Sequence, residues 1–351
     1  MITVDARALR EPFPTGVTEI AHQFISHITK KFPDARLFTG EKNFSNSLTN
    51  ARLMLGLTTL EAQSGVHSSS ERPIVFIPNT HFIHTASTAI RMQVVHDLSF
   101  FHAPQWFSPR MRMWHHATRA QRELESADIV LAVSAWTRRD LISHLKIPAE
   151  IIHVVPPAAS LPLGGERPAA LSFKHKPFFL FLGTLEKRKN VRGVIEAFEM
   201  IKNLPMLREF QLVLAGRAGF GAPRARELPD RVHHISYITP PEKWWLLKHA
   251  TALVYPSFFE GFGLPPLEAA AVGCPTIVSD CTAPPETMGD AALHVSPYDI
   301  SQIALAMEAI VVDKKLASLC RTRGFDRVRW YSADKQRAAL DAAFAHAQTL
   351  L

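Results

Sequence analysis

The stretch Glu260-Gly-Phe-Gly-Leu-Pro-Pro-Leu-Glu268 places a carboxylate on each side of a glycine loop that leads into a helix start. Gly261 and Gly263 carry no side chain, so the backbone N–H groups of this loop can come close to a ligand. The paired prolines suit a first helical turn, and Gly273 suits the position just beyond a helix end. Because a helix N-terminus carries partial positive charge, the stretch predicts a cradle for a phosphate group.

The two carboxylates extend this predicted cradle. Glu260 stands before the loop, where it can reach a polar group beyond the phosphate. Glu268 is expected in the first helical turn, where its oxygens can accept hydrogen bonds from hydroxyl groups. A phosphate cradle between two hydroxyl-binding carboxylates is what a sugar nucleotide requires.

The composition is that of a globular protein with excess positive charge. The 351 residues suggest two domains with separate cores, and 47% hydrophobic with 20% charged residues excludes a disordered chain. The net charge of +7 favours anionic partners, namely nucleotide phosphates, a pyrophosphate-linked lipid or an anionic membrane surface, although it would also serve simple solubility. The basic residues are scattered and form no nucleic-acid-binding module, so no nucleic-acid partner is expected.

Cysteine usage and hydropathy bear on localisation. The three cysteines have no zinc spacing, so they are expected to be reduced thiols. The chain opens directly on a predicted strand, which indicates no signal peptide. No apolar run approaches the ~20 residues of a membrane span. The sequence therefore predicts a cytoplasmic protein whose only membrane contact is peripheral, at the inner face of the cell membrane.

Short apolar runs alternate with helical patterns, which predicts an α/β fold with parallel sheets. The expected strands are Ile74–Ile77, Gln93–Val95, Ile129–Val133, His153–Val155, Phe178–Leu182, Gln211–Ala215, Leu253–Tyr255, Thr276–Val278 and Leu293–Val295. Helices are expected over Ser108–Ser126, after a Ser134 cap, over Val191–Ile201, after a Thr239–Glu242 capping box and over Ala333–Leu350. A stretch rich in proline and glycine, Pro156–Lys176, is predicted to link the domains.

Two further loops follow strands of the second half, at the edge where parallel sheets bind ligands. In Gly183–Asn190, Gly183 and Thr184 open a loop whose Arg188 and Lys189 would suit a diphosphate; the alternative is a solvated basic turn. In Ala215–Gly221, Arg217 can reach a phosphate, although a plain turn explains that loop equally well.

Other candidates lie in three places. Tyr237 and Ile238 precede the capping box, where backbone groups can bind a base edge and Tyr237 can pack beside it, although for the tyrosine alone core packing is the favoured role. His96 follows a strand in the first half and can bind a sugar hydroxyl, or it can be merely structural. Gly16 precedes a helix and leaves room for a ligand.

Taken together, these residues resemble glycosyltransferase family four, the retaining nucleotide-sugar transferases with the GT-B fold. The resemblance covers nearly the whole chain and is strongest over Tyr255–Glu268. Its other pieces are Val4–Arg7 with Gly16, Val95–Leu98, Ala127–Ser134, Gly183–Asn190, Gly273–Pro275, Pro285-Glu286 and Gly289–Ala291.

The resemblance implies two Rossmann-like domains facing each other across a cleft. Residues 1–160 would form the acceptor-side domain and 161–332 the nucleotide-sugar domain, with 333–351 packing back on the first.

It also implies a role for each candidate. Glu268 would bind the ribose hydroxyls, Glu260 would contact the donor sugar, and Lys189 with Arg188 would neutralise the leaving diphosphate. Backbone N–H groups of Phe262, Gly263 and Leu264 would hold the phosphates. His96 would meet the sugar, and Gly16 would leave room for diphosphate and acceptor.

Three positions depart from the family pattern. Thr184 stands where the family often has arginine, which leaves Lys189 and Arg188, with Arg217, to supply positive charge. Pro157-Ala158 replaces a common Asn-Gly at the end of the first domain, and Tyr331-Ser332-Ala333 replaces a Phe-Ser-Trp pattern.

The resemblance predicts transfer of a hexose, with mannose from GDP-mannose as the best single choice, to a lipid-linked or oligosaccharide acceptor in surface polysaccharide synthesis. No cofactor besides the nucleotide sugar is expected, and no metal, because the chain has no Asp-X-Asp motif. Two alternatives remain: a nucleotide-sugar epimerase of the same fold, and a non-catalytic subunit that binds the donor.

The predicted helix 108–126 carries basic and apolar side chains, which suits either an anionic membrane surface or ordinary packing. They are Arg110, Arg112, Arg119 and Arg122 beside Met111, Trp114 and His115.

Overall fold

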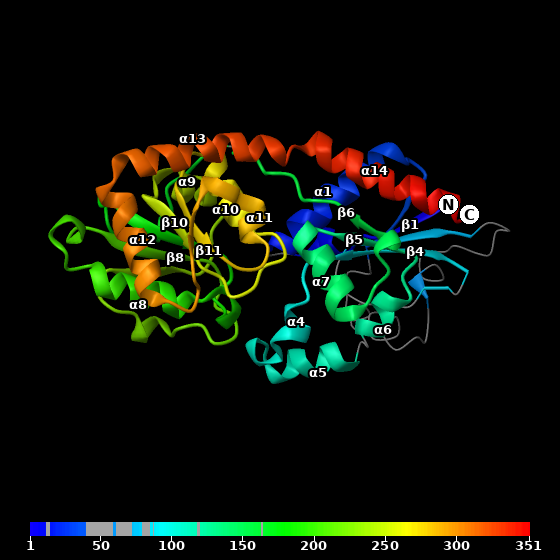
Figure 1. Cartoon of the computed structure of the whole chain (residues 1–351), viewed down its shortest axis with the longest axis horizontal. Coiled ribbons are helices and arrows are strands. Elements are labelled where there is room, and N and C mark those ends of the chain that lie inside the picture. Colours follow the sequence, from blue (N-terminus) through cyan, green and yellow to red (C-terminus); the bar gives the residue numbers. More distant parts are fainter. Residues whose placement is uncertain are drawn as a thin grey trace. The chain divides into compact units, whose positions relative to one another are not determined.

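The computed structural model describes residues 1–11, 15–39, 59–60, 72–78, 85–86, 88–117, 120–162 and 164–351 (Figure 1). These residues divide into two compact units. The first contains Met1–His102, Ser108–Ala158 and Ala333–Leu351, and the second contains Ala103–Phe107 and Ala159–Ser332. The sequence-based boundaries lay after residues 160 and 332, and they assigned 103–107 to the first domain.

Ala103–Phe107 contacts the rest of the second unit through the aromatic side chain of Trp106. The Trp106 ring stacks on Phe258 with centroids 5.9 Å apart, and it lies 6.3 Å from the Phe259 ring. Both partners stand directly before Glu260, at the start of the predicted donor loop Glu260–Glu268. A short segment from the first half of the chain therefore packs beside the predicted donor loop.

The first unit is built on a parallel sheet with the strand order β2-β1-β3-β4-β5-β6. Its strands are buried, apart from the edge strands, because helices cover parallel sheets on both faces. The bounds are β1 Ile2–Asp5, β2 Arg36–Phe38, β3 Ile74–Ile77, β4 Ile90–Val95, β5 Ile129–Ala132 and β6 Ile152–Val154. The predicted strand 74–77 is confirmed, β4 is three residues longer than predicted, and β6 is shifted by one residue.

The described part of the first unit contains six helices. They are α1 Gly16–Lys31, α4 Ser99–His102, α5 Pro109–Ala117, α6 Ala120–Glu125, α7 Ala135–Leu145 and α14 Ala333–Thr349, with 3-10 turns η1 Arg7–Arg10 and η3 Ala149–Ile151. Ser134 caps α7 as predicted, since its hydroxyl accepts from Thr137 N–H at 2.9 Å. The predicted helix 108–126 is described as α5 and α6, and residues 118–119 lie outside the description.

The C-terminal helix α14 is held against the first unit by charge and by aromatic packing. Asp341 Oδ1 lies 2.7 Å from His27 Nε2 and 2.8 Å from Lys31 Nζ, both on α1. The Phe344 ring lies 5.2 Å from the ring of Phe32 and stacks 5.9 Å from that of Phe76. The C-terminal helix α14 thus completes the core of the first unit.

The second unit contains another parallel sheet, with the order β12-β11-β10-β7-β8-β9. The first strand of this unit, β7, lies near the centre, and later strands extend the sheet on both sides. Ligands bind at such a switch point, beyond the carboxyl ends of the strands. The bounds are β7 Phe178–Leu182, β8 Gln211–Ala215, β9 Val232–Ile235, β10 Ala252–Tyr255, β11 Thr276–Ser279 and β12 Leu293–Val295, so the predicted ranges of β7, β8 and β12 are confirmed.

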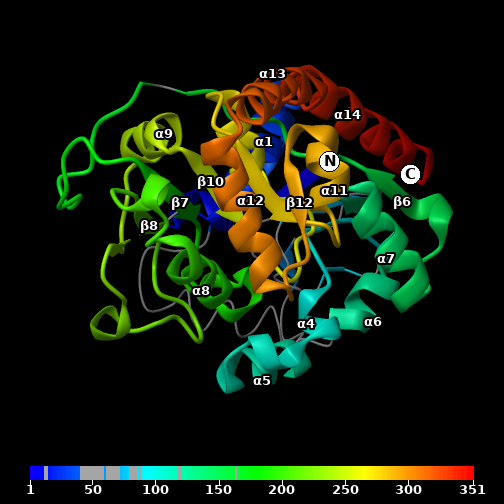
Figure 2. The same ribbon diagram turned by 60° about the vertical axis from the view of Figure 1, so that its left-hand side comes forward.

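Helices cover both faces of the second sheet. Figure 2 shows α8 and α12 side by side, and their apolar residues pack on one face, whereas α9 packs on the other. The helices are α8 Val191–Ile201, α9 Pro240–His249, α10 Leu264–Ala271, α11 Pro284–Met288, α12 Ile300–Val312 and α13 Lys314–Trp330. The 3-10 turns are η2 Pro104–Trp106, η4 Lys187–Lys189, η5 Pro205–Leu207, η6 Ala225–Glu227 and η7 Gly289–Ala291.

Candidate active site

The loops after β7 and β8 meet through two glycines. Gly183 and Gly216 have φ values of +133° and +139°, a region that side chains disfavour. A Cβ atom on Gly216 would lie 2.1 Å from the carbonyl oxygen of Gly183, so the two loops touch through their backbones. A Cβ atom on Gly183 would lie 2.8 Å from Lys189 Nζ. Because Gly183 has no side chain, the Lys189 ammonium can lie against the carboxyl end of β7.

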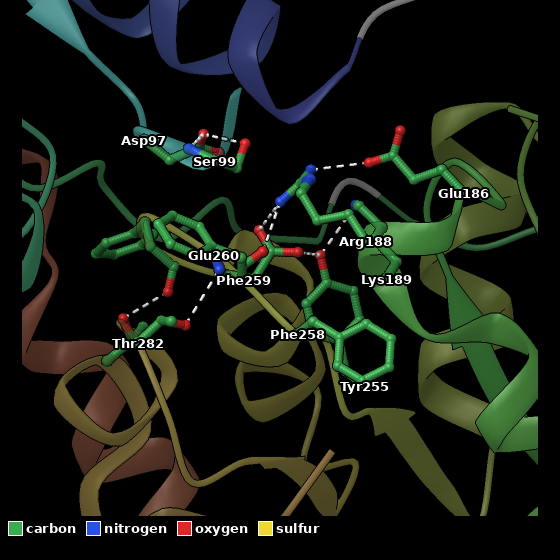
Figure 3. A network of polar contacts seen from close by, with 12 residues as sticks. Asp97, Ser99, Glu186, Arg188, Lys189, Tyr255, Phe258, Phe259, Glu260 and Thr282 are labelled. Atoms are coloured by element: carbon green, nitrogen blue, oxygen red, sulfur yellow. Dashed lines mark hydrogen bonds and ion pairs between the residues drawn. The ribbon is translucent and has the colours of Figure 1, made fainter. Parts of the chain in front are cut away.

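A polar network surrounds Glu260 (Figure 3). Arg188 Nη1 lies 3.3 Å from Glu260 Oε2, and the Tyr255 hydroxyl donates to Glu260 Oε1 at 2.9 Å. Lys189 Nζ donates to the same tyrosine hydroxyl at 2.9 Å. The Glu260 N–H donates to Thr282 Oγ1 at 3.1 Å. The sequence-predicted residues Arg188, Lys189 and Glu260 are thus brought together.

Arg188 also fixes the loop that carries Glu260. Its guanidinium donates to the Phe259 carbonyl at 2.7 Å and to Glu186 at 2.9 Å, and its own carbonyl accepts from the Phe258 N–H at 2.9 Å. Arg188 therefore bridges the loop after β7 and the loop after β10. Its guanidinium pairs with the Glu260 carboxylate, whereas the sequence predicts that it binds a diphosphate together with Lys189.

Burial makes this network electrostatically strong. Glu260 is 8% exposed and Tyr255 is 1% exposed. A buried carboxylate is stable only when cations and hydrogen-bond donors compensate it, and Arg188 and Tyr255 do so here. Burial, together with the neighbouring Glu260 carboxylate, raises the pKa of the Tyr255 hydroxyl well above its ordinary value.

The start of α10 has the geometry of an anion cradle. Gly263 is the N-cap with φ of +92°, and the two prolines occupy the first turn, as predicted. The carbonyl of Phe262 accepts a 2.6 Å hydrogen bond from the Thr287 hydroxyl, which orients the peptide unit entering the helix. Gly273, with φ of +72°, follows the helix end as predicted. Leu264 opens the helix, where backbone N–H groups lack intrahelical partners.

Glu268 lies one turn further along α10 than predicted. The helix begins at Leu264, which places Glu268 in its second turn, and the first turn holds no acidic residue. The carboxylate is buried, and its Oε1 lies 2.5 Å from Lys243 Nζ, on α9. Lys243 was not among the predicted site residues, because no local pattern connects α9 with α10.

The remaining donor-side candidates are spread along the same edge of the sheet. Thr184 is half-buried next to Gly183, and Arg217 is exposed just after Gly216. Tyr237 is 55% exposed, so the core packing favoured for this residue from the sequence is wrong. Ile238 is half-buried against the hydrophobic cluster that contains Trp244.

Two candidates belong to the first unit. His96 follows β4 with its ring buried; its Nε2 lies 2.9 Å from the Pro78 carbonyl, and its Nδ1 has no hydrogen-bond partner among the described residues. Burial lowers the pKa of this imidazole, which favours its neutral form. Gly16 is the exposed first residue of α1, directly after the N-cap Thr15 and within the Thr15–Thr18 capping box.

Two family profiles match the chain over most of its length. Residues 35–161 match the glycosyltransferase family 4 profile, and residues 166–327 match the profile of glycosyl transferases group 1. The chain therefore belongs to glycosyltransferase family four.

Several curated relatives are named as bacterial mannosyltransferases. O-antigen chain mannosyltransferase B of Escherichia coli is 29% identical over 268 residues, which are 73% of this chain and 69% of that protein. The serotype-specific mannosyltransferase WbdA of Escherichia coli is 27% identical over 55% of this chain, and the match spans only 25% of WbdA.

Solved structures share the fold at low identity. Sucrose-phosphate synthase from Thermosynechococcus elongatus aligns with a TM-score of 0.75 at 17% identity, over 100% of this chain and 99% of that chain. The Anabaena protein HepE, solved in complex with UDP-glucose, aligns with a TM-score of 0.70 at 14% identity, over 98% and 99% of the two chains. These likenesses establish the GT-B fold.

Within the part of the chain that the structure describes, no helix is both long and apolar enough to cross a membrane.

Proposed function

We propose that this glycosyltransferase moves a hexose from a nucleoside diphosphate sugar to an acceptor alcohol with retention of the anomeric configuration. One observation carries the proposal: Lys189, Glu260 and the start of α10 all lie at the switch point of the second sheet. A cation, a carboxylate and free backbone N–H groups at that edge match the three parts of a nucleotide sugar that must be held.

Each residue is proposed to bind a different part of the donor. Glu268 accepts from the ribose hydroxyls, with Lys243 beside it as a donor to the nucleoside. The N–H groups of Phe262, Gly263 and Leu264 hold the phosphates. Lys189 stabilises the diphosphate as it departs, since negative charge grows there while the sugar bond breaks.

Glu260 faces the sugar in this proposal. Its contacts with Arg188 and Tyr255 orient its carboxylate. Such a group stabilises positive charge on the sugar ring and orients the donor, and we favour this role over a covalent intermediate. Arg188 acts mainly by holding Glu260, which leaves Lys189 as the cation for the diphosphate.

The proposal extends to the donor sugar, the acceptor and two residues of the first unit. The sugar transferred is mannose, from GDP-mannose, because several of the curated relatives are named as mannosyltransferases. The acceptor is a lipid-linked saccharide at the cytoplasmic face of the membrane. His96, neutral and with an unpartnered buried Nδ1, contacts the sugar, and Gly16 leaves room for the diphosphate.

Catalysis is proposed to need neither a metal nor an organic cofactor, because Lys189 and the α10 N-terminus supply positive charge. Activity in excess EDTA tests this. Loss of activity that added magnesium or manganese restores would contradict the metal-free mechanism.

A thermal-shift panel tests donor binding. A ligand that binds only the folded state at one hundred times its dissociation constant stabilises it by about 2.7 kcal/mol. One nucleoside diphosphate, with GDP as the first choice, should raise the melting temperature above all others, with NAD as a negative control. A panel in which no nucleoside diphosphate or nucleotide sugar shifts the transition would contradict the proposal.

A further inference from the structure

Tyr255 ends β10 between two residues that the proposed function needs. Its hydroxyl accepts a hydrogen bond from Lys189 Nζ and donates one to Glu260 Oε1, each at 2.9 Å (Figure 3). Lys189 Nζ also lies over the tyrosine ring, 5.2 Å from its centroid. The ring itself is fully buried and stacks on Phe181. One oxygen atom therefore separates an ammonium from a carboxylate.

The carboxylate of Glu260 is held from two sides. Oε1 faces Tyr255 and Oε2 faces Arg188, while the Glu260 N–H is bound by Thr282. Within the part of the chain that the structure describes, the Lys189 ammonium has no comparable second anchor; it contacts the hydroxyl and the ring of Tyr255. Removing the hydroxyl would thus free Lys189 more than Glu260.

Opposite charges two hydrogen-bond lengths apart attract strongly in a buried site. Without a spacer, a flexible lysine side chain would close onto the carboxylate and form a direct ion pair. In that pair, the ammonium would be turned from the phosphates, and the carboxylate would be neutralised for the sugar. A hydroxyl satisfies both charges and still keeps them apart.

We propose that Tyr255 is a positioning residue, whose hydroxyl keeps Lys189 and Glu260 separate and aimed so that one serves the departing diphosphate and the other the sugar. This inference rests on the proposed function. The direction of the hydrogen bonds is stable, because burial raises the pKa of the tyrosine well above its ordinary value and the hydroxyl keeps its proton. Tyr255 therefore donates to Glu260 across the working pH range.

The first test is the variant Tyr255→Phe, which removes only the hydroxyl. We expect kcat to fall about 100-fold, the loss that a misplacement of about 1 Å can cause, while the affinity for the nucleoside alone is unchanged. The matched control is Tyr298→Phe, an exposed tyrosine of the same unit. In a Lys189→Ala background, Tyr255→Phe should add little, because the two residues act as one unit. Wild-type kcat in Tyr255→Phe, or full additivity with Lys189→Ala, would overturn the inference.

The second test observes the Tyr255 ring directly, by ¹⁹F NMR of labelled protein. The chain has four tyrosines, so uniform 3-fluorotyrosine labelling gives few ¹⁹F resonances, and Tyr237→Phe, Tyr298→Phe and Tyr331→Phe assign Tyr255 by elimination. The Tyr255 resonance should move in both Lys189→Met and Glu260→Gln. If the chemical shift of Tyr255 stays the same in either variant, the tyrosine hydroxyl does not link Lys189 and Glu260.

The two proposals can fail separately. If wild type neither binds a nucleoside diphosphate nor turns over a nucleotide sugar, the proposed function fails. If wild type is active and Tyr255→Phe equals it in kcat, only the role of Tyr255 fails.

Discussion

Lys243 Nζ lies 2.5 Å from Glu268 Oε1 in the second unit, and so joins the middle of α9 to the second turn of α10. Glu268 is 3% exposed, and burial of an ionised carboxylate requires such compensation. A ribose that binds Glu268 must therefore share this carboxylate with a lysine.

Glu268→Ala should weaken donor binding, because a buried pair of ribose hydroxyls loses its acceptor. The expected loss is about 1–3 kcal/mol, measured by calorimetry with the nucleoside diphosphate. Glu196→Ala, at an exposed position of α8, is the control and should bind normally. An unchanged affinity in Glu268→Ala would remove this residue from the site.

Lys189→Ala should lower turnover more than it weakens binding of the nucleoside alone, because the diphosphate gains charge in the transition state. Steady-state kinetics with a defined acceptor measures the effect. Lys187→Ala changes an exposed lysine of the same loop and should keep normal turnover. If Lys189→Ala also turns over normally, Lys189 is only a structural cation.

Gly216→Ala should destabilise the second unit. Its φ of +139° costs about 1–3 kcal/mol for a residue with a side chain, and the new Cβ would meet the Gly183 carbonyl. Gly164→Ala is the matched control, since Gly164 also has positive φ but faces open space. Denaturant unfolding should show the larger loss of unfolding free energy for Gly216→Ala. Equal losses would mean that the loops can separate without cost.

Binding to anionic liposomes should depend on α5 and α6. Met111 and Met113 are exposed on α5 beside exposed Arg110 and Arg112, and each arginine near an anionic surface adds about 1 kcal/mol. Sedimentation with liposomes should rise with anionic lipid, fall with salt, and weaken when glutamine replaces Arg110, Arg112, Arg119 and Arg122. Arg119 lies outside the described residues.

The control for this prediction changes four exposed arginines outside these helices to glutamine: Arg224, Arg226, Arg329 and Arg337. An equal loss of binding would indicate net charge alone. A protein that ignores anionic liposomes at low salt would make α5 and α6 ordinary structural helices.

The sequence predicted elements where local signals were strong. The apolar run Phe178–Leu182 ends at a glycine and forms β7 over the predicted range, and the Thr239–Glu242 capping box forms as expected. The donor loop was also recognisable, since its glycines and prolines have specific backbone requirements. These features depend on neighbouring residues, which a sequence displays directly.

Long-range relationships were out of reach. Tyr255 was assigned only to a strand, because its link to Lys189 spans 66 positions of the chain. Glu268 was placed one turn too early, since helix starts are uncertain without the cap geometry. Trp106 packs within the second unit, although the segments on either side of Ala103–Phe107 belong to the first. Each of these depends on tertiary packing.

The most direct test of the central claim is ¹H NMR of the reaction with the identified nucleotide sugar and an acceptor alcohol. We predict a new glycoside whose anomeric configuration equals that of the donor, with release of the nucleoside diphosphate. Donor incubated alone should keep its sugar configuration at every carbon. An inverted glycoside, or an epimerised donor without acceptor, would contradict the proposed retaining transfer.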